Sequence, residues 1–107
     1  IKIVAEYIPD TSTDSMKVLI DEIKKKSAKT VVILTTIAKE KVQLLIGVSD
    51  DLVAQGVHAG SLVKQGSESL DGGGGGRPNF AQGGGSKIEK AEEVLSELVR
   101  AVVDQIK

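Results

Sequence analysis

The sequence predicts a small mixed β-sheet with helices packed on it, in the α/β class near its border with α+β. Residues 1–8 alternate between two faces, as a strand does, and residues 31–48 contain two apolar runs with many β-branched side chains. Residues 87–107 instead repeat their apolar positions at helical spacing. The expected order is strand, helix, strand, strand, helix, glycine-rich loop and helix.

The first strand and the first helix have recognisable boundaries. Pro9 ends the strand, and residues 11–13 are all Ser or Thr, which favour the N-cap of a helix. Thr11 also stands three residues before Asp14, the spacing of a capping box. The apolar residues that follow share one helical face: Met16, Leu19, Ile20 and Ile23. Because a strand–helix–strand crossover is right-handed and joins parallel strands, we expect the first two strands to be parallel.

The two apolar runs, 31–38 and 42–48, are separated by the charged residues Lys39–Lys41. This arrangement predicts an antiparallel hairpin with an exposed turn. Asp50 and Asp51 follow the second run, where a pair of acids could bind a cation but more often complements a helix dipole.

Two helices complete the pattern. The first, over Ala59–Leu70, is weaker because its glycines lower helix propensity. His58 precedes it without any Cys or other His, so we interpret it as solvated or capping. The second, Lys87–Lys107, has the strongest apolar stripe, Ile88–Ile106, which we interpret mainly as a core face.

Composition excludes several classes of protein. The 107 residues fit one domain, 1–107, which we interpret as the globular C-terminal fragment of a longer chain. With no Cys and one His, neither a disulfide framework nor a zinc cluster is expected. A net charge of −1 argues against electrostatic binding over the whole surface, and no apolar run is long enough to span a bilayer. We expect a cytoplasmic domain with no membrane partner, no cofactor and no catalytic activity of its own.

The glycine-rich segment 71–86 holds eight of the twelve glycines and is expected to be a loop within the domain. It matches neither the Walker A motif nor the dinucleotide-binding pattern. It also contains Arg77–Gln82, which is not linker composition. Glycine backbone lets several N–H groups converge on an anion, and Arg77 adds a planar fork of donors suited to phosphate. Residues 16–47 carry seven Lys against three acids, so a local basic face is expected.

The stretch Gly72–Gly84, GGGGGRPNFAQGG, closely resembles the terminal motif of alanyl-tRNA synthetases, a glycine run followed by Arg-Pro-Asp-Met-Ala-Gln-Ala-Gly-Gly. Two upstream segments, Leu44–Leu52 and Val57–Val63, resemble those that precede the motif in that family. The chain departs from the pattern at three positions, with Asn79 for Asp, Phe80 for Met and Gly83 for Ala. The resemblance identifies the chain as similar to the C-terminal domain of these enzymes, often called C-Ala.

This resemblance implies a tRNA-binding module that contacts the tRNA elbow and links aminoacylation with editing of mischarged tRNA(Ala). The parent chain would be an ATP-dependent alanine–tRNA ligase whose ATP, Mg²⁺ and editing-domain zinc belong to earlier domains. Its partners would be tRNA(Ala) and the other domains of the same synthetase. The RNA-binding residues expected from the motif and the basic end of the first helix are Gly74, Gly75, Gly76, Arg77, Asn79, Gln82, Lys24 and Lys25.

Two alternatives remain open from the sequence. A related domain accompanies DHH-type phosphoesterases and helps to hold a nucleotide, but it carries a Gly-Gly-Gly-His motif where this chain has Arg77 after its glycines. The stripe Ile88–Ile106 could alternatively make the domain a homodimerisation module. For Arg77 itself, recognition of RNA competes with a structural role in which it pairs with Asp71 or a carbonyl and holds the loop in place.

Overall fold

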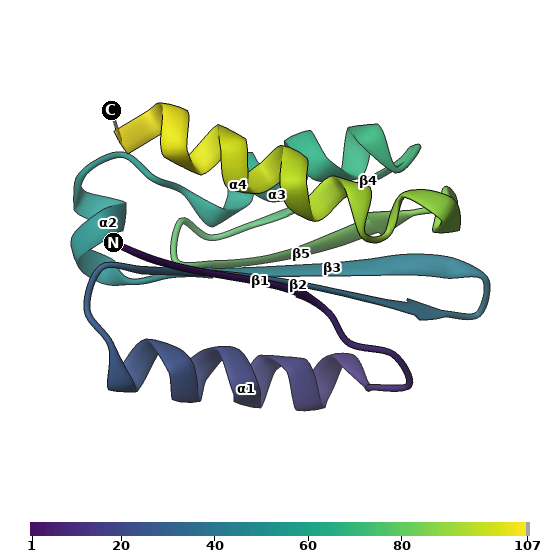
Figure 1. Ribbon diagram of the computed structural model, residues 1–107, viewed down its shortest axis with the longest axis horizontal. Helices are drawn as coiled ribbons and strands as arrows, with labels where there is room; N and C mark the ends of the chain where they lie inside the picture. Colours follow the sequence, from purple (N-terminus) through teal and green to yellow (C-terminus); the bar gives the residue numbers. More distant parts are fainter. Residues whose placement is uncertain (107) are drawn as a thin grey trace.

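The computed structural model describes residues 1–106 (Figure 1). In chain order the elements are β1 (Lys2–Tyr7), α1 (Thr13–Lys26), β2 (Thr30–Ala38), β3 (Lys41–Val48), α2 (Asp50–Ala54), α3 (Ala59–Ser69), β4 (Gly72–Gly76), β5 (Phe80–Gly85), the 3-10 turn η1 (Ile88–Lys90) and α4 (Glu93–Ile106).

The five strands form one mixed sheet in the order β1-β2-β3-β5-β4. β1 and β2 are parallel, as expected for a crossover through α1, and β2 and β3 form the expected antiparallel hairpin. The hairpin turn, Lys39–Glu40, has positive φ at both residues, 53° and 61°, as a tight two-residue turn requires. The predicted fold class is therefore confirmed.

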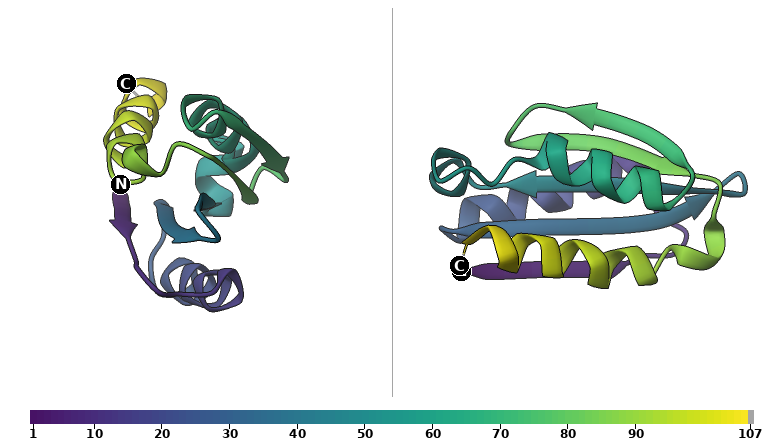
Figure 2. Two further views of the ribbon diagram at one scale, coloured as in Figure 1. Left: turned by 90° about the vertical axis from the view of Figure 1, so that its right-hand side faces the viewer. Right: turned by 90° about the horizontal axis from the view of Figure 1, so that it is seen from above.

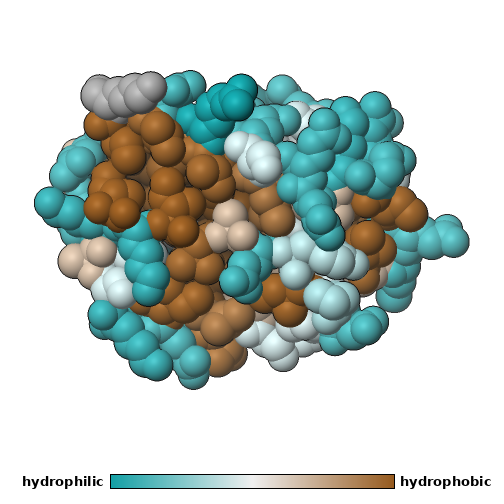
Figure 3. Space-filling view, in the orientation of Figure 1, coloured by the Kyte–Doolittle hydropathy of each residue, from teal (hydrophilic) through white to brown (hydrophobic). Residues whose placement is uncertain are grey.

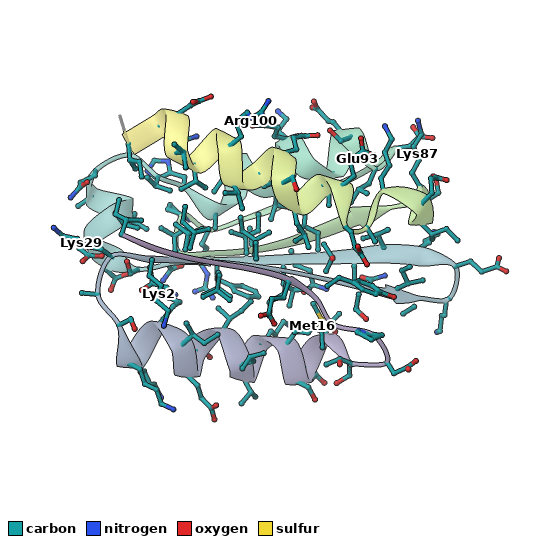
Figure 4. All side chains as sticks on the ribbon, viewed as in Figure 1. Lys2, Met16, Lys29, Lys87, Glu93 and Arg100 are labelled. Carbon is teal, nitrogen blue, oxygen red and sulfur yellow. The ribbon has the colours of Figure 1, made fainter. Side chains whose placement is uncertain are left out.

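Helices cover the sheet from both sides (Figure 2). α1 packs on β2 and β3 from one face, whereas α3 and α4 pack on the other. Met16 points from α1 towards the sheet (Figure 4). The core on the α1 side consists of Met16, Ile20, Val32, Leu34 and Leu45. The larger core on the opposite side includes Val31, Ile33, Leu44, Ile46, Leu62, Val63, Leu98 and Val102.

The helix boundaries differ from the sequence expectation in three places. Ser12, not Thr11, is the N-cap of α1, and its side chain accepts a hydrogen bond from the Ser15 amide at 3.1 Å. The residues after β3 form two helices, α2 and α3, with the positive-φ Gly56 between them. The last helix begins at Glu93, after the turn η1, and Lys107 lies outside the described residues.

The glycine-rich segment is not a loop: its residues form β4 and β5, an antiparallel hairpin at one edge of the sheet. Side-chain alternation cannot reveal a strand made of glycine, but main-chain hydrogen bonding needs no side chain. Several of these glycines are required because α3 packs directly on the hairpin backbone. A Cβ at Gly83 would meet the Val63 side chain at 2.7 Å and would also collide with Ser67 Oγ. That same hydroxyl accepts a hydrogen bond from the Gly84 amide at 3.2 Å.

Most of the apolar stripe of the last helix is buried in the core, as expected. Val94, Leu95, Leu98 and Val102 are buried against the sheet, whereas Ile88 and Val103 are exposed. In the described residues, no helix is long and apolar enough to cross a membrane, and no cluster of three or more His, Cys or acidic residues could hold a metal ion.

Candidate nucleic-acid interface

One face of the β4–β5 hairpin is uncovered. Seen end-on, the hairpin extends past α1, which packs on β2 and β3 (Figure 2). A Cβ at Gly73 or Gly75 would have no neighbour within 4 Å, so neither glycine is required by packing. Glycine within a strand weakens it, and an unneeded glycine typically marks a place where another backbone approaches closely. The two open glycines therefore indicate a binding surface.

Amide side chains share this face with the open glycines. Gly75 pairs with Gln82, which in turn pairs with Leu45 of the α1-side core. In the next row Gly73 pairs with Gly84, and Gly84 with Gln43. Directly paired residues point to the same side of a sheet. Gln82 therefore lies beside Gly75, and Gln43 lies on the same face one strand further into the sheet. Both are half-buried and offer amide donors and acceptors.

Arg77 occupies the turn between β4 and β5. Its amide donates to the Phe80 carbonyl at 3.0 Å, which places the two residues opposite each other. Its side chain is exposed and has no hydrogen bond or ion pair among residues 1–106. Asp71 lies at the other end of β4, so the Arg77–Asp71 pair considered from the sequence does not form. The guanidinium is free to contact a ligand.

Two lysines of α1 reach the same turn. Lys24 Nζ donates to the Asn79 carbonyl at 3.1 Å, and Lys17 Nζ lies 5.9 Å from the centre of the Phe80 ring. Positions i and i+7 fall on one side of a helix, so Lys17 and Lys24 approach the hairpin together. Lys25 is exposed one position further round the helix and has no hydrogen bond to the hairpin in the described part of the chain.

The predicted RNA-binding residues are thus mostly brought together. The turn, β4, Gln82 and Lys24 are contiguous, whereas Lys25 is not joined to them. Asn79 participates through its main chain, because its carbonyl accepts from both the Val48 amide, at 2.9 Å, and Lys24. Gly73, Gln43 and Lys17 were missed from the sequence. Only the Lys17–Lys24 spacing could have identified one of them, since the other two depend on strand register.

The other side of the hairpin is held by α3. A Cβ at Gly60 would meet the Gly76 carbonyl at 2.9 Å, and the Ala59 amide donates to the Pro78 carbonyl at 2.7 Å. His58 is the N-cap residue of α3, is exposed and makes no side-chain capping bond. These contacts fix the turn that presents Arg77.

Asp51, the second of the two acids after β3, has a structural role. The Ser49 hydroxyl donates to Asp51, and the amides of Lys29 and Leu52 also donate to it. These hydrogen bonds, that from Ser49 first, lower the pKa of Asp51 below its usual 3.8, against a smaller opposing effect of burial. Asp51 therefore joins the start of α2 to the start of β2, which accounts for its position without a bound cation.

Comparison with known proteins identifies the family. The DHHA1 domain family model matches residues 1–105, so the chain belongs to the DHHA1 domain family. Within it, the chain is 42% identical over 99 residues to an alanine–tRNA ligase of Bacillus velezensis and 38% identical over 107 residues to that of Desulforamulus reducens. These matches cover 92% and 100% of the chain but only 11% and 12% of the ligases, so the chain spans about a ninth of their length.

Solved structures agree with this assignment. The C-Ala domain from Aquifex aeolicus alanyl-tRNA synthetase has a TM-score of 0.76 at 28% identity, covering 90% of this chain and 88% of that one. The similarity to C-Ala expected from the glycine motif is thereby confirmed. A DHH-domain protein described as a member of a family of ribosomal proteins shares the fold alone, with a TM-score of 0.59 at 16% identity, covering 87% of this chain and 21% of that one.

Proposed function

We propose that the chain is the C-terminal tRNA-binding module of a cytoplasmic alanine–tRNA ligase, and that it binds tRNA(Ala) through the uncovered face of the β4–β5 hairpin. The observation that supports this most directly is that the open glycines, Arg77 and two lysines of α1, Lys17 and Lys24, lie at the same hairpin. The Arg77 side chain has no partner among the described residues. Glycine admits an RNA backbone closely, while the cations neutralise its phosphates.

The geometry suits an exposed RNA corner better than a regular duplex. Proteins recognise such corners by stacking on unpaired bases and by contacting phosphates, and both an arginine plane and an aromatic ring serve for stacking. In a chain with 2% aromatic residues, Arg77 supplies the exposed plane at the turn. The Phe80 ring instead packs against the α1-side core, with Lys17 Nζ over it. We therefore place the tRNA elbow at this turn.

In the parent enzyme, such binding would hold one tRNA while aminoacylation and editing occur on other domains. This module itself is proposed to be non-catalytic. ATP, Mg²⁺ and zinc would act in the earlier domains, and tRNA and those domains would be its partners.

Equilibrium binding of the 107-residue chain to a tRNA(Ala) transcript, against a plain RNA duplex of equal length, tests the proposal. If ~2–4 phosphates are neutralised, log K should fall with log salt at a slope between about −1.5 and −3.5. Arg77→Ala should weaken tRNA binding about five-fold or more with an unchanged melting temperature. The matched control is Arg100→Ala. Arg100 is exposed on α4 (Figure 4), which covers the face of the sheet opposite to the proposed RNA face. Equal affinity for tRNA and duplex, or equal effects of the two variants, would refute the proposed interface.

Homodimerisation is a second candidate function, supported by a different surface. An apolar area lies over α4 and β1 (Figure 3), where a groove of about 950 Å³ is lined by Tyr7, Leu95, Val99 and Val103 among others. Light scattering after size-exclusion chromatography tests this, since a Val103→Glu variant should convert a dimer to a monomer.

A further inference from the structure

A hollow lies on the α1 side of the sheet, away from the β4–β5 turn. It has a volume of about 410 Å³ and is lined by the start of α1, the end of β2, the start of β3, and Gln82 of β5. The residues that line the hollow belong to neither of the two apolar cores. Most of the residues that line it carry polar groups, Lys39 and Lys41 among them, and none of the described lining residues is an acid.

Thr36 lines this hollow and has an unpaired hydroxyl. The residue is 1% exposed, and its Oγ1 has no hydrogen-bond partner among residues 1–106. The preceding Thr35 is also buried, but it faces the other side of the sheet and donates to the Ala91 carbonyl at 2.9 Å. A buried hydroxyl without a partner destabilises a fold. Thr36 is thus better explained by a ligand than by packing.

The N-terminus of α1 borders the same hollow. Ser12 satisfies the Ser15 amide, but the amides of Thr13 and Asp14 have no partner among residues 1–106. Unpaired amides at the start of a 14-residue helix favour an anion, as does the helix dipole. Asp14 itself lies in the first turn, yet it does not line the hollow.

The hollow is continuous with the proposed RNA face. Gln43 and Gln82 line it and also lie on the same face of the sheet as the open glycines. Together with Lys41, they also line the adjoining hollow that contains Gly72 and Gly73. A strand that crosses the open glycines would therefore bring a neighbouring phosphate to this hollow.

We propose that the hollow at the start of α1 binds a phosphate group, and that its source is the backbone of the RNA lying on the hairpin. This rests on the proposed RNA-binding function. Thr36 and the Thr13 amide donate to the phosphate oxygens, while Lys39 and Lys41 neutralise its charge.

Thr36→Val is the decisive variant, because it keeps the shape of the side chain and removes only the hydroxyl. Affinity for tRNA(Ala) should fall about three- to ten-fold while the melting temperature stays the same or rises. Lys41→Gln should reduce the salt slope by about one. The matched control is Thr35→Val, which loses the bond to Ala91 and should lower the melting temperature without weakening tRNA binding by the folded protein.

Titration of inorganic phosphate into ¹⁵N-labelled protein distinguishes a site for free phosphate from a site for the phosphates of RNA. Shifts of the Thr13 amide that disappear in Thr36→Val support the site, and an accompanying loss of tRNA affinity supports RNA as its ligand. Phosphate-induced shifts with unchanged tRNA affinity would overturn RNA as the source. No shifts, with unchanged affinity, would overturn the site altogether. The proposed function fails separately, if wild-type protein does not prefer tRNA or if Arg77→Ala binds normally.

Discussion

Lys24 Nζ donates to the Asn79 carbonyl at 3.1 Å, joining α1 to the β4–β5 turn across 55 positions of sequence. The same carbonyl accepts from the Val48 amide, so one peptide group connects the helix, β3 and the turn. The candidate interface therefore includes α1, which the glycine motif alone does not reveal. The Lys24–Asn79 hydrogen bond also makes the orientation of the turn sensitive to a single side chain.

We expect Lys24→Met to weaken tRNA binding and to lower the free energy of unfolding by about 1 kcal/mol. A hydrogen bond to a charged donor contributes about 1.5–3 kcal/mol, and partial exposure of Lys24 reduces this. Met retains the apolar stem that packs near Gly47. Chemical denaturation and tRNA titration measure the two effects. Lys25→Met is the control, and equal losses in both variants would show that only overall charge matters.

The glycines of the hairpin should divide into two classes. Gly83→Ala places a methyl group against Val63 and Ser67 and should destabilise the fold by about 1–3 kcal/mol, as overpacking does. Gly75→Ala meets open space, so its melting temperature should be unchanged or slightly higher. Because the added methyl group lies on the proposed RNA face, tRNA affinity should nevertheless fall. Normal binding by Gly75→Ala would place the RNA elsewhere.

The strands and helices that bury side chains were predictable because burial leaves a period in the sequence. The alternation of residues 1–8 and the two runs within 31–48 predicted three strands and their pairing. By contrast, β4 consists of glycine alone and has no period, so its pairing with β5 emerges only from main-chain hydrogen bonds.

The candidate site was predictable to the same extent. The Arg77 motif identified the turn, because its composition is distinctive. The uncovered position of Gly73 and the approach of Lys17 to Phe80 depend on which face each strand presents, and that requires the register. Thr35 and Thr36 look alike in the sequence, yet within the described part of the chain only the Thr35 hydroxyl has a hydrogen-bond partner.

Asp51 should make stability depend on pH in the acid range. Its folded pKa is lowered below the usual 3.8, mainly by the Ser49 hydroxyl. The ionised form is therefore favoured by folding, and its contribution is present above the unfolded pKa and lost as the pH falls through the folded pKa. Asp51→Asn should melt at a lower temperature than wild type at about pH 7, with the difference shrinking below about pH 4. A difference that stays constant from neutral to strongly acid pH would contradict this role.

Arg77→Lys tests whether the turn recognises RNA by shape or only by charge. Lysine keeps the positive charge but loses the planar fork, which can stack on a base or bind a phosphate through two donors. The side chain has no partner among the described residues, so the melting temperature should not change. We expect tRNA affinity to fall about three- to ten-fold while the salt slope stays within experimental error, because the number of neutralised phosphates is the same. Arg77→Ala should weaken binding further and reduce the slope by about one. If lysine restores full affinity, Arg77 acts as a point charge, and the stacking attributed to this turn is wrong.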